Sequence, residues 1–314
     1  APYIRAFERG GALYQALMSF ALDGFIGKSD IVGTEHGWTL DEMLALQAQY
    51  APGAPGMGGL SRDAAAGRYI DCIYTEFIDW ETGECSFDSD EFVKIIDYLA
   101  TLDESIDDDK RRVTYLLDGE KIISPITWHN VIHLMSYDVV FGNIKYTIKG
   151  YPTNGKNGIA CSYTNSPALG ITTACTDPEG AWSFVRTLFS EYIGDSGIGL
   201  PTCKKALDVF NAKWMTENTW INEDGEEVVE WKFVGGLVDN EIDPNIMLYA
   251  ATQEQVDRFY ELIDACDLVW GKDDTITDIA KEELGPFFAG NRTARETANM
   301  IQSRVRIYVS EHIR

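Results

Sequence analysis

Two histidines have a spacing that can bind a metal. His129 and His133 are four residues apart, so on a helix they would share one face, a spacing at which two imidazoles can hold zinc. The H-E-x-x-H pattern is missing, because Asn130, Val131 and Ile132 lie between the two histidines, and no third ligand is evident. We therefore expect no metal and no cofactor.

Carboxylates are the other abundant reactive groups. The chain has 50 Asp and Glu residues, and glycosidases use two carboxylates about 5–10 Å apart. With so many acids some such pair is expected by chance, so no particular carboxylate pair indicates catalysis. A secreted glycan-acting enzyme is kept as an alternative function. The motifs G-x-S-x-G, G-x-x-x-x-G-K-[ST] and G-x-G-x-x-G do not occur. We predict that the chain is not an enzyme.

Aromatic side chains are frequent, with 8 Trp, 15 Tyr and 14 Phe. Aromatic side chains can form the apolar platform of a concave ligand site, and they also dominate protein cores, so their number permits such a site without proving one. Trp128 is the first candidate platform, because it follows the strand-like run 122–127 and precedes a helix, and ligands of open α/β sheets lie at strand ends. Core packing is the alternative for Trp128.

The other candidate ligand-binding residues also have a structural explanation. Tyr260 lies on the apolar stripe of its helix, which favours the core. Tyr74 and Trp80 flank the turn before Phe87, where large aromatics usually pack, and Phe20 lies beside a segment that crosses between domains. The candidate hydrogen-bonding side chains, each of which could instead be solvated surface, are Glu76, Asp79, Asn130 and Asn165.

Composition limits the class of protein. The 26 Lys and Arg against 50 Asp and Glu give a net charge of -24, which disfavours nucleic acid and anionic membrane surfaces as partners. Six scattered cysteines without a C-x-x-C pair favour small buried residues, with one or two disulfides left open. No run of about 18 apolar residues could span a bilayer. The first residues do not resemble a signal peptide or a mature N-terminus, so we expect further chain upstream.

The elements that would position these residues alternate between strands and helices, which is the α/β pattern. Capping boxes begin helices at Thr39, Thr252 and Thr293, and Asp177 caps a helix that starts with Pro178. Further helices are expected at 61–78, 90–102, 129–141, 203–215 and 275–289. Strands are expected at 11–18, 121–127, 145–149, 159–163 and 169–175, with a hairpin at 219–233. The chain is expected to cross between two domains near 19–28 and 144–152.

Several segments, in this order along the chain, resemble the extracellular solute-binding proteins of carbohydrate-type ABC importers. Together these segments cover nearly the whole chain. They are Gly11-Ala12-Leu13-Tyr14 with Gly27-Lys28, Gly37-Trp38-Thr39-Leu40-Asp41-Glu42, Phe77-Ile78-Asp79-Trp80 through Phe87-Asp88-Ser89, Gly150-Tyr151-Pro152-Thr153 with Gly155, Glu179-Gly180-Ala181-Trp182-Ser183-Phe184, and Gly199-Leu200-Pro201.

The resemblance implies a two-lobed α/β fold of the type II periplasmic-binding-protein-like architecture. The first lobe would be partial, formed by 1–20 and 158–198, and the helix-rich second lobe nearly complete, formed by 21–157 and 199–314. The resemblance also implies binding of a sugar or oligosaccharide between the lobes, with an aromatic of the cleft supplied at Trp128 and another at Tyr260. It further implies hinge closure, delivery to permease subunits, and an extracellular lipoprotein whose anchor lies outside this chain. A surface adhesion module is a further alternative.

Overall fold

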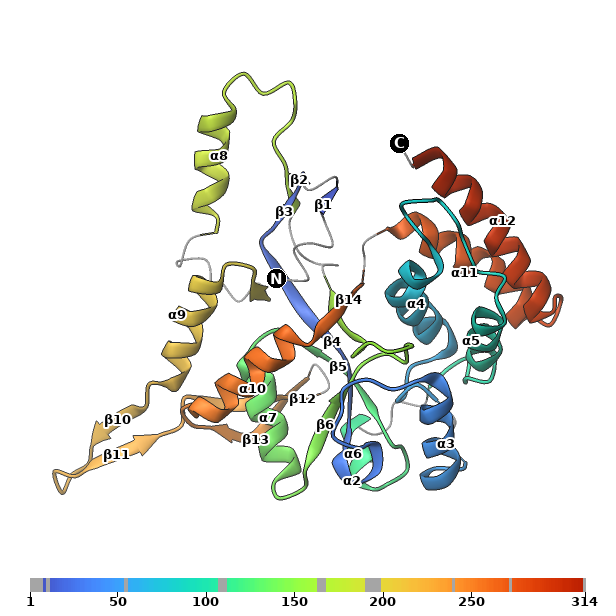
Figure 1. Ribbon diagram of the computed structural model, residues 1–314. Helices are drawn as coiled ribbons and strands as arrows, with labels where there is room; N and C mark the ends of the chain where they lie inside the picture. The colour runs from blue at the N-terminus through green and yellow to red at the C-terminus, as the bar shows by residue number, and fades with distance from the viewer. Residues whose placement is uncertain are drawn as a thin grey trace. The chain divides into compact units, whose positions relative to one another are not determined.

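The computed structural model describes residues 8–9, 12–53, 56–106, 112–162, 168–189, 199–238, 241–270 and 273–312. It is a mixed α/β structure, as the alternation of strands and capped helices predicts (Figure 1). The chain forms two compact units, each discontinuous in sequence. Unit 1 comprises 1–24, 126–146 and 161–267, and unit 2 comprises 25–125, 147–160 and 268–314.

A six-stranded sheet contains the strands in which the chain passes from one unit to the other. Its order is β14-β7-β4-β5, and β6 and β9 also pair with β4. The division between the units falls inside β4, β5, β7 and β14, and directly after the first residue of β6. The bounds are β4 (Ser19–Lys28), β5 (Ser124–Trp128), β6 (Tyr146–Lys149), β7 (Ile159–Ser162), β9 (Leu200–Pro201) and β14 (Cys266–Trp270).

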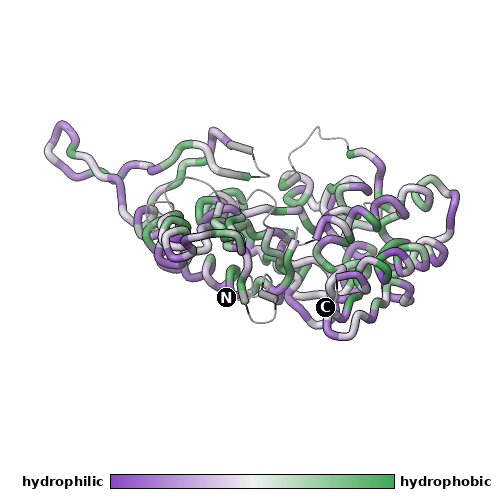
Figure 2. The backbone as a smooth tube through the Cα atoms, turned by 90° about the horizontal axis from the view of Figure 1, so that it is seen from above, coloured by the Kyte–Doolittle hydropathy of each residue, from purple (hydrophilic) through white to green (hydrophobic). Residues whose placement is uncertain are grey.

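Unit 2 is a helical unit around one apolar core. Its helices carry one buried face each, and Figure 2 shows hydrophobic and hydrophilic residues alternating along the helices. Helices α4 and α11, α11 and α12, and α5 and α12 pack together (Figure 1). The bounds are α2 (Ser29–Val32), α3 (Leu40–Tyr50), α4 (Arg62–Ile73), the 3₁₀ turn η1 (Tyr74–Phe77), α5 (Asp90–Ala100), α6 (Arg112–Leu117), α11 (Asp274–Phe288) and α12 (Ala294–His312).

In unit 1, α7 packs against α10 and the hairpin β12–β13, and a second hairpin, β10–β11, is largely exposed. The helices are α7 (Val131–Phe141), α8 (Pro178–Thr187), α9 (Lys204–Met215) and α10 (Gln253–Asp264). The hairpin strands are β10 (Asn218–Ile221), β11 (Glu227–Glu230), β12 (Phe233–Val238) and β13 (Glu241–Leu248). Short strands form the pairs β1 (Glu8–Arg9) with β2 (Ala12–Leu13) and β3 (Ala16–Leu17) with β8 (Ala168–Leu169).

The predicted domain bounds differ from the observed units. The sequence places 126–146 and 199–267 in the second lobe, whereas the structure groups them with residues 1–24 in unit 1. The physical reason is that β5 and β14 also carry the chain across, and β14 follows a helix without a turn signal.

Two predicted strands are shorter than expected. The run 11–18 is interrupted, with β2 and β3 separated by residues in no regular structure. Of the predicted run 169–175 only Leu169 lies in a strand, at the end of β8. Residues 173–174, which belong to the predicted strand 169–175, form a turn. The six cysteines are free thiols, of which Cys72, Cys161 and Cys266 are buried.

All four predicted helix caps are confirmed. At α3, the backbone N–H of Glu42 donates to Thr39 Oγ1 at 3.2 Å, and that of Thr39 donates to Glu42 Oε2 at 2.7 Å. The same reciprocal pair forms at Thr252 and at Thr293, and Asp177 accepts from the N–H of Gly180 at 2.9 Å. These bonds satisfy backbone donors that have no partner inside the helix.

Replacing Thr39 with alanine is expected to lower the free energy of unfolding by about 1 kcal/mol, because the cap of α3 loses its acceptor. The burial of Leu40 and Met43 on the same helix is expected to stay. Urea unfolding followed by circular dichroism measures the loss. Thr39→Ser keeps a hydroxyl at this position and is the matched control, so an equal loss in both variants would contradict the capping role.

Candidate functional site

Three predicted site residues of unit 1 lie in or against its core. Trp128, the last residue of β5, is 1% exposed, and its ring centre is 5.8 Å from that of Tyr137. Within the described residues the indole Nε1 of Trp128 has no hydrogen-bond partner. Phe20, on β4, is buried, and Asn130 caps α7 by accepting from the N–H of Ile132 at 3.1 Å. These residues present almost no apolar platform to a solute.

Tyr260 is the predicted aromatic of unit 1 that keeps part of its surface. It lies half-buried on α10, and its hydroxyl donates to Asp208. Burial, followed by this bond, raises the pKa of Tyr260. The ammonium of Lys204 lies 4.9 Å from the ring centre and binds Asp208 at 2.7 Å. The ring is thus held in a fixed orientation with one cation over it.

The predicted residues of unit 2 are divided between core, turn and pocket. Tyr74 is completely buried, and burial raises its pKa. Trp80 is 37% exposed in the turn after η1, where Asp79 accepts from the N–H of Glu81 at 2.8 Å and so holds the turn. Glu76 is half-buried and binds Lys156 at 2.9 Å. Among the predicted site residues that the structure describes, Glu76 lines a pocket. Asn165 lies outside the residues that the structure describes.

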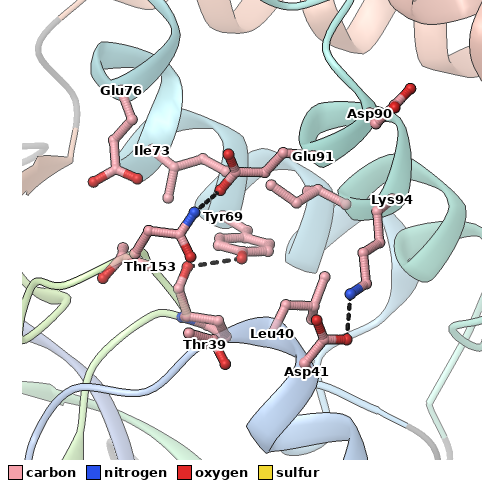
Figure 3. Close-up of a pocket in the computed structure, with 13 residues that line it drawn as sticks. Thr39, Leu40, Asp41, Tyr69, Ile73, Glu76, Asp90, Glu91, Lys94 and Thr153 are labelled. Atoms are coloured by element: carbon pink, nitrogen blue, oxygen red, sulfur yellow. Dashed lines mark hydrogen bonds and ion pairs between the residues drawn. The ribbon is translucent and has the colours of Figure 1, made fainter.

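That pocket has a volume of about 360 Å³ and lies within unit 2 (Figure 3). Its floor is formed by buried residues: Leu40, Tyr69, Ile73, Ile95, Pro152 and Thr153. Its rim is polar and mostly exposed: Thr39, Asp41, Glu76, Asp90, Glu91, Lys94 and Asn154. An apolar floor below a ring of polar groups is the usual composition of a small-molecule site.

Ion pairs and hydrogen bonds order the rim. Figure 3 shows Glu76 on the opposite side of the pocket from Lys94 and Asp41, which form an ion pair. The amide of Asn154 donates to Glu91 Oε1. Asp90 pairs with Arg295, which comes from α12. Each of these carboxylates therefore has a partner, but the partner of Glu91 is a neutral amide.

The loop 150–158 forms one wall because its backbone is tied to neighbouring elements. The N–H of Gly150 donates to the carbonyl of His36 at 3.1 Å, and that of Thr153 to Trp38 at 2.9 Å. The hydroxyl of Tyr69 donates to the carbonyl of Pro152 at 2.8 Å. A Cβ at Gly150 would lie 2.1 Å from the carbonyl oxygen of Asn157, so only glycine permits this close approach.

Sequence reasoning missed most of this pocket. Asp41, Asp90 and Glu91 are acids in the first turns of α3 and α5, where the helix dipole favours negative charge. This preference accounts for the three acids as residues that stabilise their helices. The signal that could have found the site is that two capped helices each carry acids in their first turn, so two such ends side by side form an acidic rim.

The prediction that the two histidines share a helix face is wrong, because α7 begins at Val131 and His129 precedes its cap, Asn130. The ring centres of His129 and His133 are 5.6 Å apart. Among the described residues no group of three or more His, Cys, Asp or Glu side chains could hold a metal ion. Burial lowers the pKa of both rings, that of His133 to about 3.

No family model and no curated protein sequence matches this chain. Solved structures do match. The sugar-binding protein MalE of Xanthomonas citri is similar with a TM-score of 0.59 and 11% identity, over 99% of this chain and 74% of that one. A periplasmic oligogalacturonide-binding protein of Yersinia enterocolitica has a TM-score of 0.55 and 14% identity, over 99% and 76%. A solute-binding protein of an ABC transporter of Thermotoga lettingae, bound with α-D-tagatose, has a TM-score of 0.52 and 12% identity, over 96% of this chain and 74% of that one.

These similarities define the fold. The chain has the type II periplasmic-binding-protein-like α/β fold, as the sequence predicts. The three structures named above are a sugar-binding protein, an oligogalacturonide-binding protein and a solute-binding protein of an ABC transporter. A designed cysteine esterase is also similar over 99% of this chain, with a TM-score of 0.50 and 13% identity. In the described part of the chain, no helix combines the length and hydropathy that crossing a bilayer needs.

Proposed function

We propose that this chain binds a sugar or oligosaccharide outside the cytoplasm and delivers it to the permease of an ABC importer. The observation that carries the proposal is the fold, which it shares over 99% of its length with a MalE protein and an oligogalacturonide-binding protein. Proteins of two compact units joined by several chain crossings can close on a ligand as a hinge, and the ligand favours the closed form through its contacts.

The proposal assigns the solute contacts to residues that present surface. Tyr260 and Trp80 keep exposed aromatic area, which suits the apolar face of a sugar ring. Trp128, Tyr74 and Phe20 are buried, so the proposal does not assign them as solute contacts. An extracellular location with a lipid anchor belongs to the same proposal, and so does the contact with permease subunits. The binding event itself needs no catalytic residue.

A panel of mono- and oligosaccharides in a thermal-shift assay tests the proposal. A ligand at one hundred times its dissociation constant stabilises the folded state by about 2.7 kcal/mol, which raises the melting temperature by several degrees. We expect such a rise for one class of sugar, with a smaller rise in Tyr260→Ala or Trp80→Ala.

The panel includes oligogalacturonides, maltose and tagatose, because these cover acidic, neutral oligomeric and ketose sugars. Titration calorimetry with the best sugar gives the affinity, and a chromogenic glycoside in parallel measures turnover. Melting temperatures unchanged up to millimolar sugar would refute the assignment of carbohydrate as the solute. Release of the chromophore would refute a purely binding function.

A further inference from the structure

The pocket of unit 2 is formed by one unit alone. All of the lining residues that the structure describes belong to 25–125 and 147–160. A solute that favours hinge closure has to contact both units, whereas a ligand of this pocket contacts unit 2. We propose that the pocket is a separate binding site for a small organic cation with primary ammonium groups on an aliphatic chain. This inference does not depend on the proposed sugar binding.

The charge of the rim favours a cation. Among the residues that the structure describes, four carboxylates line the pocket, those of Asp41, Glu76, Asp90 and Glu91, against one ammonium, that of Lys94. Cations of the protein pair with the first three, but Glu91 is bonded to an amide, which neutralises no charge. An ionised carboxylate has about four acceptor positions, and charge-assisted bonds from an ammonium are stronger than those from a neutral donor. Glu91 is therefore the primary partner of the ligand.

The apolar floor of the pocket indicates which kind of molecule would carry the ammonium group. Leu40, Ile73 and Ile95 are buried aliphatic side chains beneath the acidic rim. Methylene groups gain free energy when they cover such a surface, while the charged end stays at the polar rim. A bare metal ion would use none of this apolar area. It would also need several converging ligands, and the described residues contain no group of three that could hold one.

The ion pair of Lys94 with Asp41 offers a second anchor. Both side chains are largely exposed, and exposed ion pairs contribute little to stability, so an incoming ammonium can replace Lys94 at small cost. Asp41 lies across the pocket from Glu91 in Figure 3, with the apolar floor between them. A short aliphatic diamine can thus place one ammonium at each side and its methylene chain over the floor.

The probe that tests the site is 1,4-diaminobutane, with 1,4-butanediol as the uncharged molecule of matched length. Calorimetry and thermal shift on the whole chain at low ionic strength should show binding of the diamine and none of the diol. Added salt should weaken the binding of the diamine, because its contacts with the protein are ionic and partly exposed. An equal response to diamine and diol, or no binding of the diamine, would overturn the proposal.

Two variants on α5 make the test specific. Glu91→Gln keeps a carbonyl oxygen for the Asn154 amide but removes the charge, and we expect it to weaken diamine binding at least about tenfold. Asp97→Asn removes an exposed charge of the same helix outside the pocket and should bind as wild type. Equal diamine affinity in both variants would place the ligand elsewhere.

A sugar titration of the same two variants separates this site from the proposed function. We expect the sugar response to be the same in Glu91→Gln and in wild type. Loss of diamine binding with the sugar response intact supports a second site. Loss of both together would show that the two ligands share one site and would overturn the separation.

Discussion

Replacing Trp128 with alanine is expected to lower the free energy of unfolding by about 3–5 kcal/mol. The indole is 1% exposed and packs beside Tyr137, so truncation removes buried contacts and leaves a cavity that a close-packed core fills only in part. Urea unfolding at neutral pH, followed by tryptophan fluorescence and circular dichroism, measures the change. Far fewer molecules would then be folded at a given urea concentration.

Two further variants show whether the loss comes from core packing. Trp128→Phe keeps an aromatic ring and removes a buried donor without a described partner, so a smaller loss of about 1–2 kcal/mol is expected. Trp80→Ala, at a side chain 37% exposed, should cost less than about 1 kcal/mol. Wild-type stability in Trp128→Ala together with a lost sugar response would contradict the core placement and make Trp128 a ligand contact.

The helix starts could be predicted because their physics is local. The capping boxes at Thr39, Thr252 and Thr293 need only residues three apart, and all three form. The hairpin β12–β13 and strand β14 could not be predicted in the same way. Their strands carry Gly, Asp, Asn or Pro beside apolar residues, so no clear alternation of polar and apolar side chains is present, and their pairing depends on tertiary contacts.

The site was harder to predict than the fold, because a pocket depends on which surfaces meet. Trp128 follows a strand and precedes a helix, as a ligand-binding residue of an α/β sheet would, yet its side chain turns into the core. Glu76 enters the pocket because η1 places it near the loop 150–158, through contacts about eighty residues apart along the chain, such as the ion pair with Lys156. No local pattern in the sequence reports such a contact.

Acid is expected to destabilise this protein through His133, a buried neutral imidazole. The ring is 4% exposed, and burial, together with the nearby His129, lowers its pKa from the usual 6.5 to about 3. Between these two values the unfolded chain binds the proton and the folded chain does not, so stability falls as the pH drops below 6.5. At pH 4.5 the difference of about two pH units corresponds to a loss of about 2–3 kcal/mol relative to pH 7.5.

Comparison with a variant isolates this contribution, since many carboxylates also titrate in acid. The unfolding free energy of wild type and of His133→Gln is measured in urea at pH 7.5 and pH 4.5. The glutamine cannot take up a proton, so the variant should lose about 2–3 kcal/mol less than wild type between the two pH values. The exposed His312 provides the control, because His312→Gln should follow wild type. If His133→Gln and wild type lost the same free energy, the imidazole would have to be protonated as easily in the folded protein as in the unfolded chain, and burial could not be what keeps it neutral.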